Sequence, residues 1–129
     1  MWNYNETPEH IRCCEELGIS TEIKDAIKSW ARTVGRVMTN RQKLFHRSAH
    51  NVFEIWVARV PNPDANKGNS GGFRLVYFLN VKELAIYVDK MEHRADIGGK
   101  NERPKDQQRF TAYLEDLKEY LTRELENTA

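Results

Sequence analysis

Hydrophobic residues recur at helical spacing in the first third of the chain. The segment Thr7-Pro8-Glu9 is typical of a helix start, because Thr can cap the first turn, Pro needs no hydrogen bond there and Glu lies near the positive end of the helix dipole. Gly18 is expected to end this helix. A second helix is predicted from Ser20 or Thr21, and steps of three and four residues place several apolar positions on one face, namely Ile23, Ala26, Ile27, Trp30 and Val34.

The segment after the second helix has two interpretations. Gly35 interrupts the helical pattern, so the residues from Arg36 to His46 form either a continuation of that helix or a separate helix. Either interpretation gives the segment a basic exposed side, made of Arg36, Arg41, Lys43 and Arg47.

The middle of the chain changes to runs of β-branched and aromatic residues, which are typical of strands. Strands are predicted over residues 52–60, 73–79 and 83–91, and the loop between the last two is short enough for a hairpin. Alternation along the first strand places Glu54 and Trp56 on its exposed face. We predict that the strands are antiparallel.

A last helix is predicted to begin at Pro104, and an apolar stripe extends it to about residue 126. The predicted fold class is therefore α+β, with N-terminal helices, a small antiparallel sheet of about three to four strands and a C-terminal helix over residues 104–126. A length of 129 residues fits a single domain, 1–129.

The composition predicts a soluble protein. The chain is 40% hydrophobic and 30% charged, and no run approaches the roughly 18 apolar residues of a membrane span. The first residues lack the pattern of a secretory signal, so we expect a cytoplasmic protein with no membrane partner. The adjacent Cys13 and Cys14 are expected to be reduced helix residues.

Charge is unevenly spread along the chain although the net charge is only +1. Residues 41–109 carry 13 Lys and Arg against 8 Asp and Glu, whereas residues 110–129 carry 2 against 5. A basic centre is compatible with a phosphate-rich or acidic partner, and scattered solubilising charge explains it about as well.

The common sequence signatures of catalysis and cofactor binding are absent. The chain has no phosphate-binding loop, dinucleotide fingerprint, zinc-protease motif or serine elbow. His46 and His50 have the spacing of a metal pair, but no third ligand accompanies them, so two surface histidines are the favoured interpretation. We expect neither a metal site nor a cofactor.

A polar, glycine-rich loop runs into an apolar strand that carries Arg74. Alternation places Arg74 on the same face as Val76 and Phe78, which are unusual neighbours for a charge. Two interpretations remain open. Arg74 forms a structural ion pair, with Glu54 or Asp96, or it projects toward a ligand phosphate, for which the guanidinium fork suits two oxygens.

Two segments carry a resemblance to a known family. The loop and strand read Lys67-Gly68-Asn69-Ser70-Gly71-Gly72-Phe73-Arg74. They resemble the GKSGGxR loop and strand of the RelE/HigB group in the RelE/ParE toxin superfamily, with Asn69 where Lys is usual. The segment Tyr87–Ile97 is similar to that group's later segment, in which a Tyr, a Lys and a Glu precede an acidic and an aliphatic residue. The resemblance covers about residues 19–97.

The resemblance implies a small toxin that is paired with an antitoxin. Active members of the group cut messenger RNA on the ribosome without a metal, so the resemblance implies a metal-independent endoribonuclease that inhibits translation. It also implies site roles. Arg74 would clamp the phosphate, His93 would act as acid or base, Arg94 would add positive potential and Glu54 would act as a base. RNA contacts are expected from Lys67, Lys90, Arg41 and Lys43.

Two alternatives accompany this interpretation. The chain has Glu54 and Trp56 where the best-known ribonucleases of the family place lysines, which favours a protein that keeps the fold but acts only by binding a protein or nucleic-acid partner. The other alternative is an unrelated α+β domain. The last helix has no counterpart that we can assign in the family, and it could occupy the groove of a neighbouring chain in a homodimer.

Overall fold

The computed structural model describes residues 2–33, 42–60, 72–93 and 104–126. The described elements follow the order β1 (Asn3–Glu6), α1 (Pro8–Leu17), α2 (Thr21–Thr33), β2 (Gln42–Arg47), β3 (Phe53–Val60), β4 (Phe73–Asn80), β5 (Ala85–His93), α3 (Pro104–Leu121) and a π-helical turn η2 (Thr122–Glu126). The strands form one five-stranded sheet in the order β1-β5-β4-β3-β2. The predicted α+β class is confirmed.

The sheet differs from the predicted one at both edges. The pairs β2–β3, β3–β4 and β4–β5 are antiparallel, whereas β1 pairs with β5 in parallel. The sheet is therefore mixed and has more strands than the three to four antiparallel ones predicted. The physical reason is that β1 is short and polar, and it is held by backbone hydrogen bonds to a strand about 80 residues away rather than by its own apolar pattern.

Strand β2 occupies part of the segment for which a helix was predicted. Residues Gln42–Arg47 pair with β3, so the helical interpretation of the segment is wrong over this range. A shift in register between Leu44 and His46 marks a bulge. Pairing with β3 supplies the backbone hydrogen bonds that outweigh the local helical pattern.

The ends of α1 are as the sequence predicts. The hydroxyl oxygen of Thr7 accepts a hydrogen bond from the His10 amide at 3.1 Å, which satisfies one of the free donors of the first turn. Gly18 ends the helix with a φ of 63°, a left-handed conformation that favours glycine.

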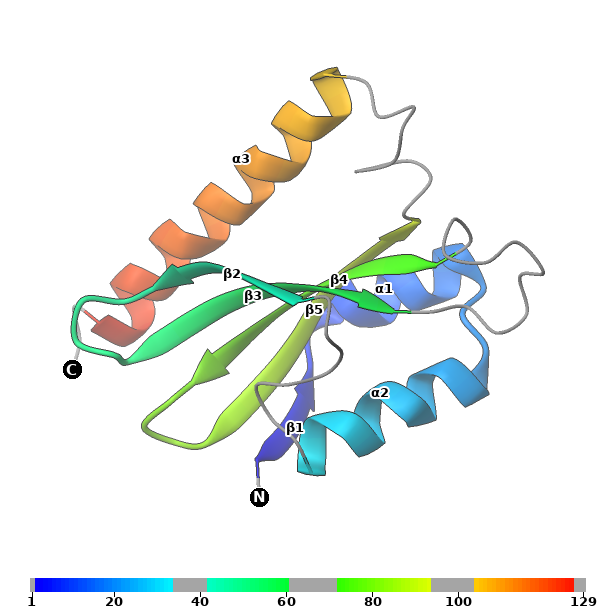
Figure 1. Ribbon diagram of the computed structural model, residues 1–129, viewed down its shortest axis with the longest axis horizontal. Coiled ribbons are helices and arrows are strands. Elements are labelled where there is room, and N and C mark those ends of the chain that lie inside the picture. Colours follow the sequence, from blue (N-terminus) through cyan, green and yellow to red (C-terminus); the bar gives the residue numbers. More distant parts are fainter. Residues whose placement is uncertain (1, 34–41, 61–71, 94–103, 127–129) are drawn as a thin grey trace.

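Helices cover both faces of the sheet, and α3 lies on the opposite side from α1 and α2 (Figure 1). One core joins α1 and α2 to the sheet and includes Ile23, Ile27, Leu75, Tyr77 and Ile86. The second core joins α3 to the other face and includes Phe53, Ile55, Phe78, Phe110 and Leu114. Each central strand therefore packs against helices on both faces of the sheet.

A buried carboxylate attaches α3 to β5. Asp89 is the extra residue of a bulge, because Val76 pairs with Lys90 whereas Tyr77 pairs with Val88. Its carboxylate accepts hydrogen bonds from the Thr7 hydroxyl at 2.8 Å and from the Tyr113 hydroxyl of α3. Burial, followed by this contact with Asp89, raises the pKa of Tyr113. Asp89 thus connects the start of α1 with the middle of α3.

Replacing Tyr113 with Phe should lower the free energy of unfolding by about 1–2 kcal/mol, because the buried carboxylate loses one of its donors. Urea unfolding measures this loss. Tyr120→Phe is the matched control, since Tyr120 lies on the same helix and is 50% exposed, and it should cost less than about 0.5 kcal/mol. Equal losses in the two variants would contradict the role assigned to Tyr113.

Candidate functional site

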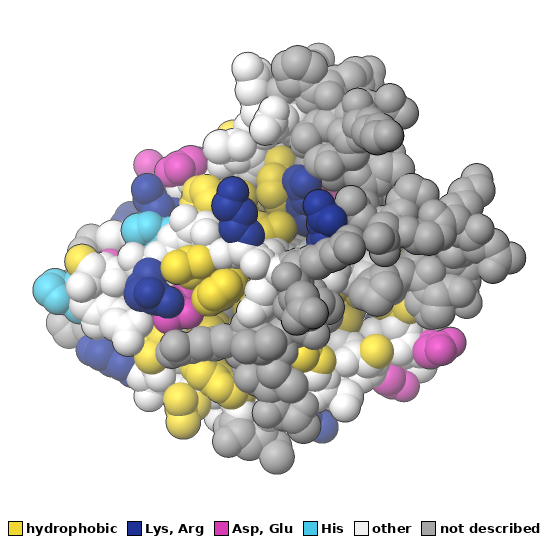
Figure 2. Space-filling model, viewed as in Figure 1, with side chains coloured by type: hydrophobic (Ala, Val, Ile, Leu, Met, Phe, Trp, Pro, Cys, Tyr) yellow, Lys and Arg dark blue, Asp and Glu magenta, His cyan; other side chains and the backbone are white. Residues whose placement is uncertain are grey.

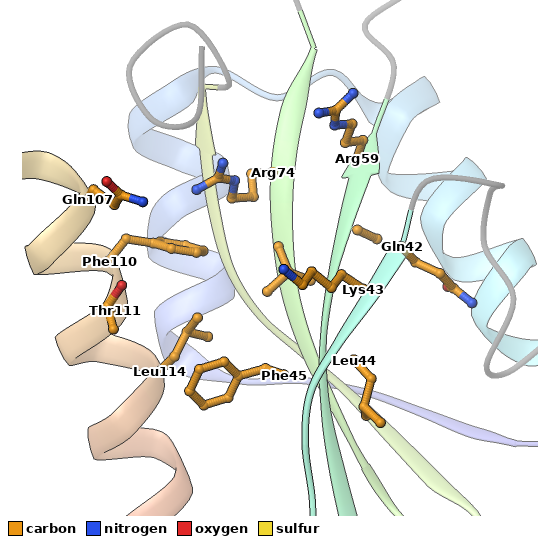
Figure 3. Close-up of a pocket in the computed structure, with 12 residues that line it drawn as sticks. Gln42, Lys43, Leu44, Phe45, Arg59, Arg74, Gln107, Phe110, Thr111 and Leu114 are labelled. Atoms are coloured by element: carbon orange, nitrogen blue, oxygen red, sulfur yellow. The ribbon is translucent and has the colours of Figure 1, made fainter. Parts of the chain in front are cut away.

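A groove lies between strands β2, β3 and β4 on one side and α3 on the other, with a volume of about 650 Å³. Its described lining contains three cations, Lys43, Arg59 and Arg74, and no acidic residue. The other lining residues are amide, hydroxyl or apolar: Gln42, Leu44, Phe45, Val57, Ala58, Gln107, Phe110, Thr111 and Leu114. Figure 3 shows Lys43 and Arg74 on the strand side of the groove, opposite α3. The lining therefore favours an anion.

Strand register places the cations side by side. Arg59 on β3 is paired with Arg74 on β4, and residues that are paired across antiparallel strands share a face of the sheet. Lys43 on β2 pairs with Val57, two residues before Arg59, so it lies on the same face. Like charges directly opposite each other are unfavourable in a sheet, and an anion bound between the two arginines would offset that repulsion.

Arg74 is held against α3. Its guanidinium carbon lies 4.6 Å from the centre of the Phe110 ring, and the residue is half-buried. Such a contact over the face of an aromatic ring is attractive and restricts the side chain. The predicted face of Arg74 is confirmed, because Val76 and Phe78 belong to the core beneath α3. The Phe110 ring therefore holds the Arg74 guanidinium beside the groove.

The same face of the sheet continues onto β5, which carries further charged side chains. Lys90 lies 4.4 Å from the centre of the Tyr113 ring and 3.1 Å from the Glu92 carboxylate. Glu92 is paired with Arg74 in the strand register. Lys90 shares the sheet face of Arg74 but does not line the groove. The described strand residues therefore give this face more cations than carboxylates. In Figure 2, Lys and Arg side chains flank hydrophobic ones near the middle of the view.

Glu54 lies on the opposite face from Arg74, which corrects two expectations from the sequence. It is 0% exposed rather than exposed, and it lies five residues from Arg59 on an unbroken strand, so its side chain points away from the groove. Its carboxylate accepts hydrogen bonds from the Arg47 Nε at 3.1 Å and the Trp56 Nε1 at 2.9 Å. Glu54 is therefore placed neither to pair with Arg74 nor to act as a base beside it.

Several predicted site residues lie outside the described part of the chain. These are Arg41, Lys67 and Arg94, together with Asp96, the second candidate ion-pair partner of Arg74. His93 ends β5 with its backbone paired to Phe73, and its side chain is outside the described part. The roles given to these residues stay predictions.

Arg59 was not predicted as a site residue, although the strand alternation that placed Arg74 applies to it as well. It follows Val57 at a spacing of two, so alternation alone places a cation on an apolar face, as it does for Arg74. Only the pairing between β3 and β4 sets the two arginines opposite each other.

Metal-binding and nucleophilic groups do not gather in the part of the chain that the structure describes. Those residues contain no group of three or more His, Cys, Asp or Glu that could hold a metal ion. The His46 ring lies 5.6 Å from the Phe53 ring, and burial lowers its pKa. Cys13 and Cys14 are free and buried, and burial raises the pKa of the Cys14 thiol to about 11. Cys14 is thus a protonated thiol near neutral pH and a poor nucleophile.

Comparisons with family models, curated proteins and solved structures find no match for this chain. Within the described ranges, no helix is long and apolar enough to cross a membrane. The resemblance to the RelE/HigB group stays a prediction from the loop and strand at Arg74, and a functional assignment must rest on the groove.

Proposed function

We propose that this protein is a RelE/HigB-like toxin that binds messenger RNA in the groove beneath α3 and thereby inhibits translation in the cytoplasm, under the control of an antitoxin. The supporting observation is that Lys43, Arg59 and Arg74 line one groove whose described lining holds no carboxylate. RNA carries a negative charge at every phosphate, and contacts from Lys and Arg supply most of the affinity in nucleic-acid complexes of this kind.

The three cations suit different parts of a phosphate backbone. A guanidinium donates two parallel hydrogen bonds to one phosphate, so Arg59 and Arg74 together would hold one phosphate between β3 and β4. Lys43 is a flexible point charge on the neighbouring strand and would neutralise an adjacent phosphate. The Phe110 ring limits the movement of Arg74, so less side-chain entropy is lost on binding.

Cleavage at this groove would require three functions: removal of a 2′-hydroxyl proton, stabilisation of charge on the phosphorus and protonation of the leaving 5′-oxygen. Arg59 and Arg74 are suited to the second function. His93 would act as acid or base in the proton transfers, Arg94 would add positive potential, and no metal would take part.

A second candidate function is RNA binding without cleavage. The observation that favours it is the position of Glu54, which is buried on the other face of the sheet. The described lining of the groove has no carboxylate and no histidine, so the groove as described offers phosphate binding but no proton transfer. A protein of this kind would inhibit translation by occupying the message.

Induction of the protein in a bacterial host should arrest growth, and Arg74→Ala should abolish the arrest because it removes the central phosphate ligand. Growth, incorporation of labelled amino acid and primer extension on abundant messages measure the effect. Lys82→Ala is the matched control, since Lys82 is an exposed cation in the turn between β4 and β5, and this variant should arrest growth like the parent.

The outcome distinguishes the two functions. Arrest with new message ends indicates an endoribonuclease, whereas arrest with intact messages indicates RNA binding alone. Unimpaired growth while the soluble parent protein accumulates would contradict both.

A further inference from the structure

The groove has an apolar interior as well as a cationic rim. Phe45 from β2 and Val57 from β3 meet Phe110 and Leu114 from α3 in the same core, and all four line the groove. Figure 3 shows the Phe45 ring directed toward Leu114, below the ends of Lys43 and Arg74. A phosphate chain alone makes no favourable hydrophobic contact with such a surface. A ligand that fills both parts of the groove would therefore offer a flat apolar group as well as negative charge.

We infer that the hollow between β2 and α3 holds one unpaired nucleobase of the bound RNA, while the phosphates on either side of that base contact Lys43 and Arg74. This inference rests on the proposed function and adds a base-binding subsite to it. The volume of about 650 Å³ is in the range of pockets that enclose small ligands. Charge complementarity selects a nucleotide over an uncharged apolar ligand.

The polar lining residues on α3 suit the edge of a base. Gln107 and Thr111 are both exposed and line the groove next to Phe110. A glutamine amide offers donors and an acceptor, and a hydroxyl offers both, which is what the edge of a base requires. Phe45 is half-buried and supplies an aromatic ring of the kind on which unpaired bases stack. Duplex RNA keeps its bases inside the helix, so the subsite selects single strands.

The inference predicts that affinity depends on the presence of bases. Fluorescence anisotropy with a labelled RNA of about 12 nucleotides, a usual length for single-strand sites, is compared with the same chain made of abasic ribose phosphates. The two chains carry equal charge. The abasic chain should bind about tenfold more weakly, as expected for the loss of base stacking in one subsite.

Two variants of α3 locate the subsite. Thr111→Phe places a ring in the hollow from an exposed helix position, so it should weaken binding of the base-bearing chain to the level of the abasic chain and leave the abasic chain unaffected. Gln108→Phe is the matched control, because Gln108 is exposed on the same helix and does not line the groove, and its binding should equal that of the parent. Neither exposed position is part of a core, so both variants should fold.

Four outcomes decide the matter. A gap between the two chains that Thr111→Phe removes supports the base subsite. Equal binding of base-bearing and abasic chains overturns the subsite while leaving phosphate binding in place, and so does a gap that Thr111→Phe leaves unchanged. Binding of neither chain overturns the proposed function together with the subsite.

Discussion

Substituting methionine for both Arg59 and Arg74 is expected to lower the affinity for single-stranded RNA about 100-fold at moderate salt, because each arginine contributes about one tenfold step through charge-assisted hydrogen bonds to phosphate. The dependence on salt should weaken as well. Because the two arginines hold one phosphate, their loss should reduce the slope of log affinity against log salt by about 0.7 for a single strand. Anisotropy titrations at several salt concentrations measure both effects.

The matched control for the arginine pair removes the same charge elsewhere. Lys28→Met with Lys82→Met takes two exposed cations from α2 and from the β4–β5 turn, away from the groove. This variant should keep almost all of the parent affinity. A loss equal to that of the arginine variant would mean that net charge alone attracts RNA, and the groove would not be the site.

Replacing Tyr77 with Ala is expected to cost about 3–5 kcal/mol in the free energy of unfolding, the usual cost of deleting a buried aromatic side chain. Tyr77 is 0% exposed. Its ring lies 5.2 Å from the Trp30 ring in an edge-on arrangement and 6.4 Å from the Trp56 ring in a stacked one. Since a domain is stable by only about 5–15 kcal/mol, urea unfolding should show a large fall in the midpoint.

Tyr77→Phe separates the ring from the hydroxyl. The Tyr77 hydroxyl donates a hydrogen bond to the Gln42 Oε1 at 2.9 Å, which ties β4 to the edge strand β2. The phenylalanine variant keeps the aromatic packing and should lose only about 1 kcal/mol. If Tyr77→Ala cost no more than Tyr77→Phe, the aromatic contacts with Trp30 and Trp56 would not stabilise this side of the sheet.

Short-range patterns predicted the interior of the fold well. The cap at Thr7 and the stop at Gly18 depend on backbone groups within one helical turn, so local sequence determines them. The three central strands were predicted from their runs of β-branched and aromatic residues, and the structure has them as β3, β4 and β5. Their antiparallel arrangement is confirmed, and the short connection between β4 and β5 accounts for that pair.

The edge strands were not predictable in the same way. The sequence of β1 is Asn-Tyr-Asn-Glu, and that of β2 is Gln-Lys-Leu-Phe-His-Arg, so neither has the composition of a strand core. Their stability comes from backbone pairing, of β1 with β5 about 80 residues away and of β2 with the next strand, β3. The predicted helix near Lys43 was wrong for this reason.

The sequence by itself determined which residue types are available for a site and which side of its own strand each one takes. Alternation was enough to set Arg74 on an apolar face, and the same rule applied to Arg59. Tertiary structure decided which of these faces coincide. The register of β3 and β4 set Arg59 opposite Arg74, the addition of β2 brought Lys43 beside them, and Glu54 was left buried on the far side. The reason is geometric, since alternation fixes a side chain relative to its strand, whereas only strand pairing and the packing of α3 fix the strands relative to one another.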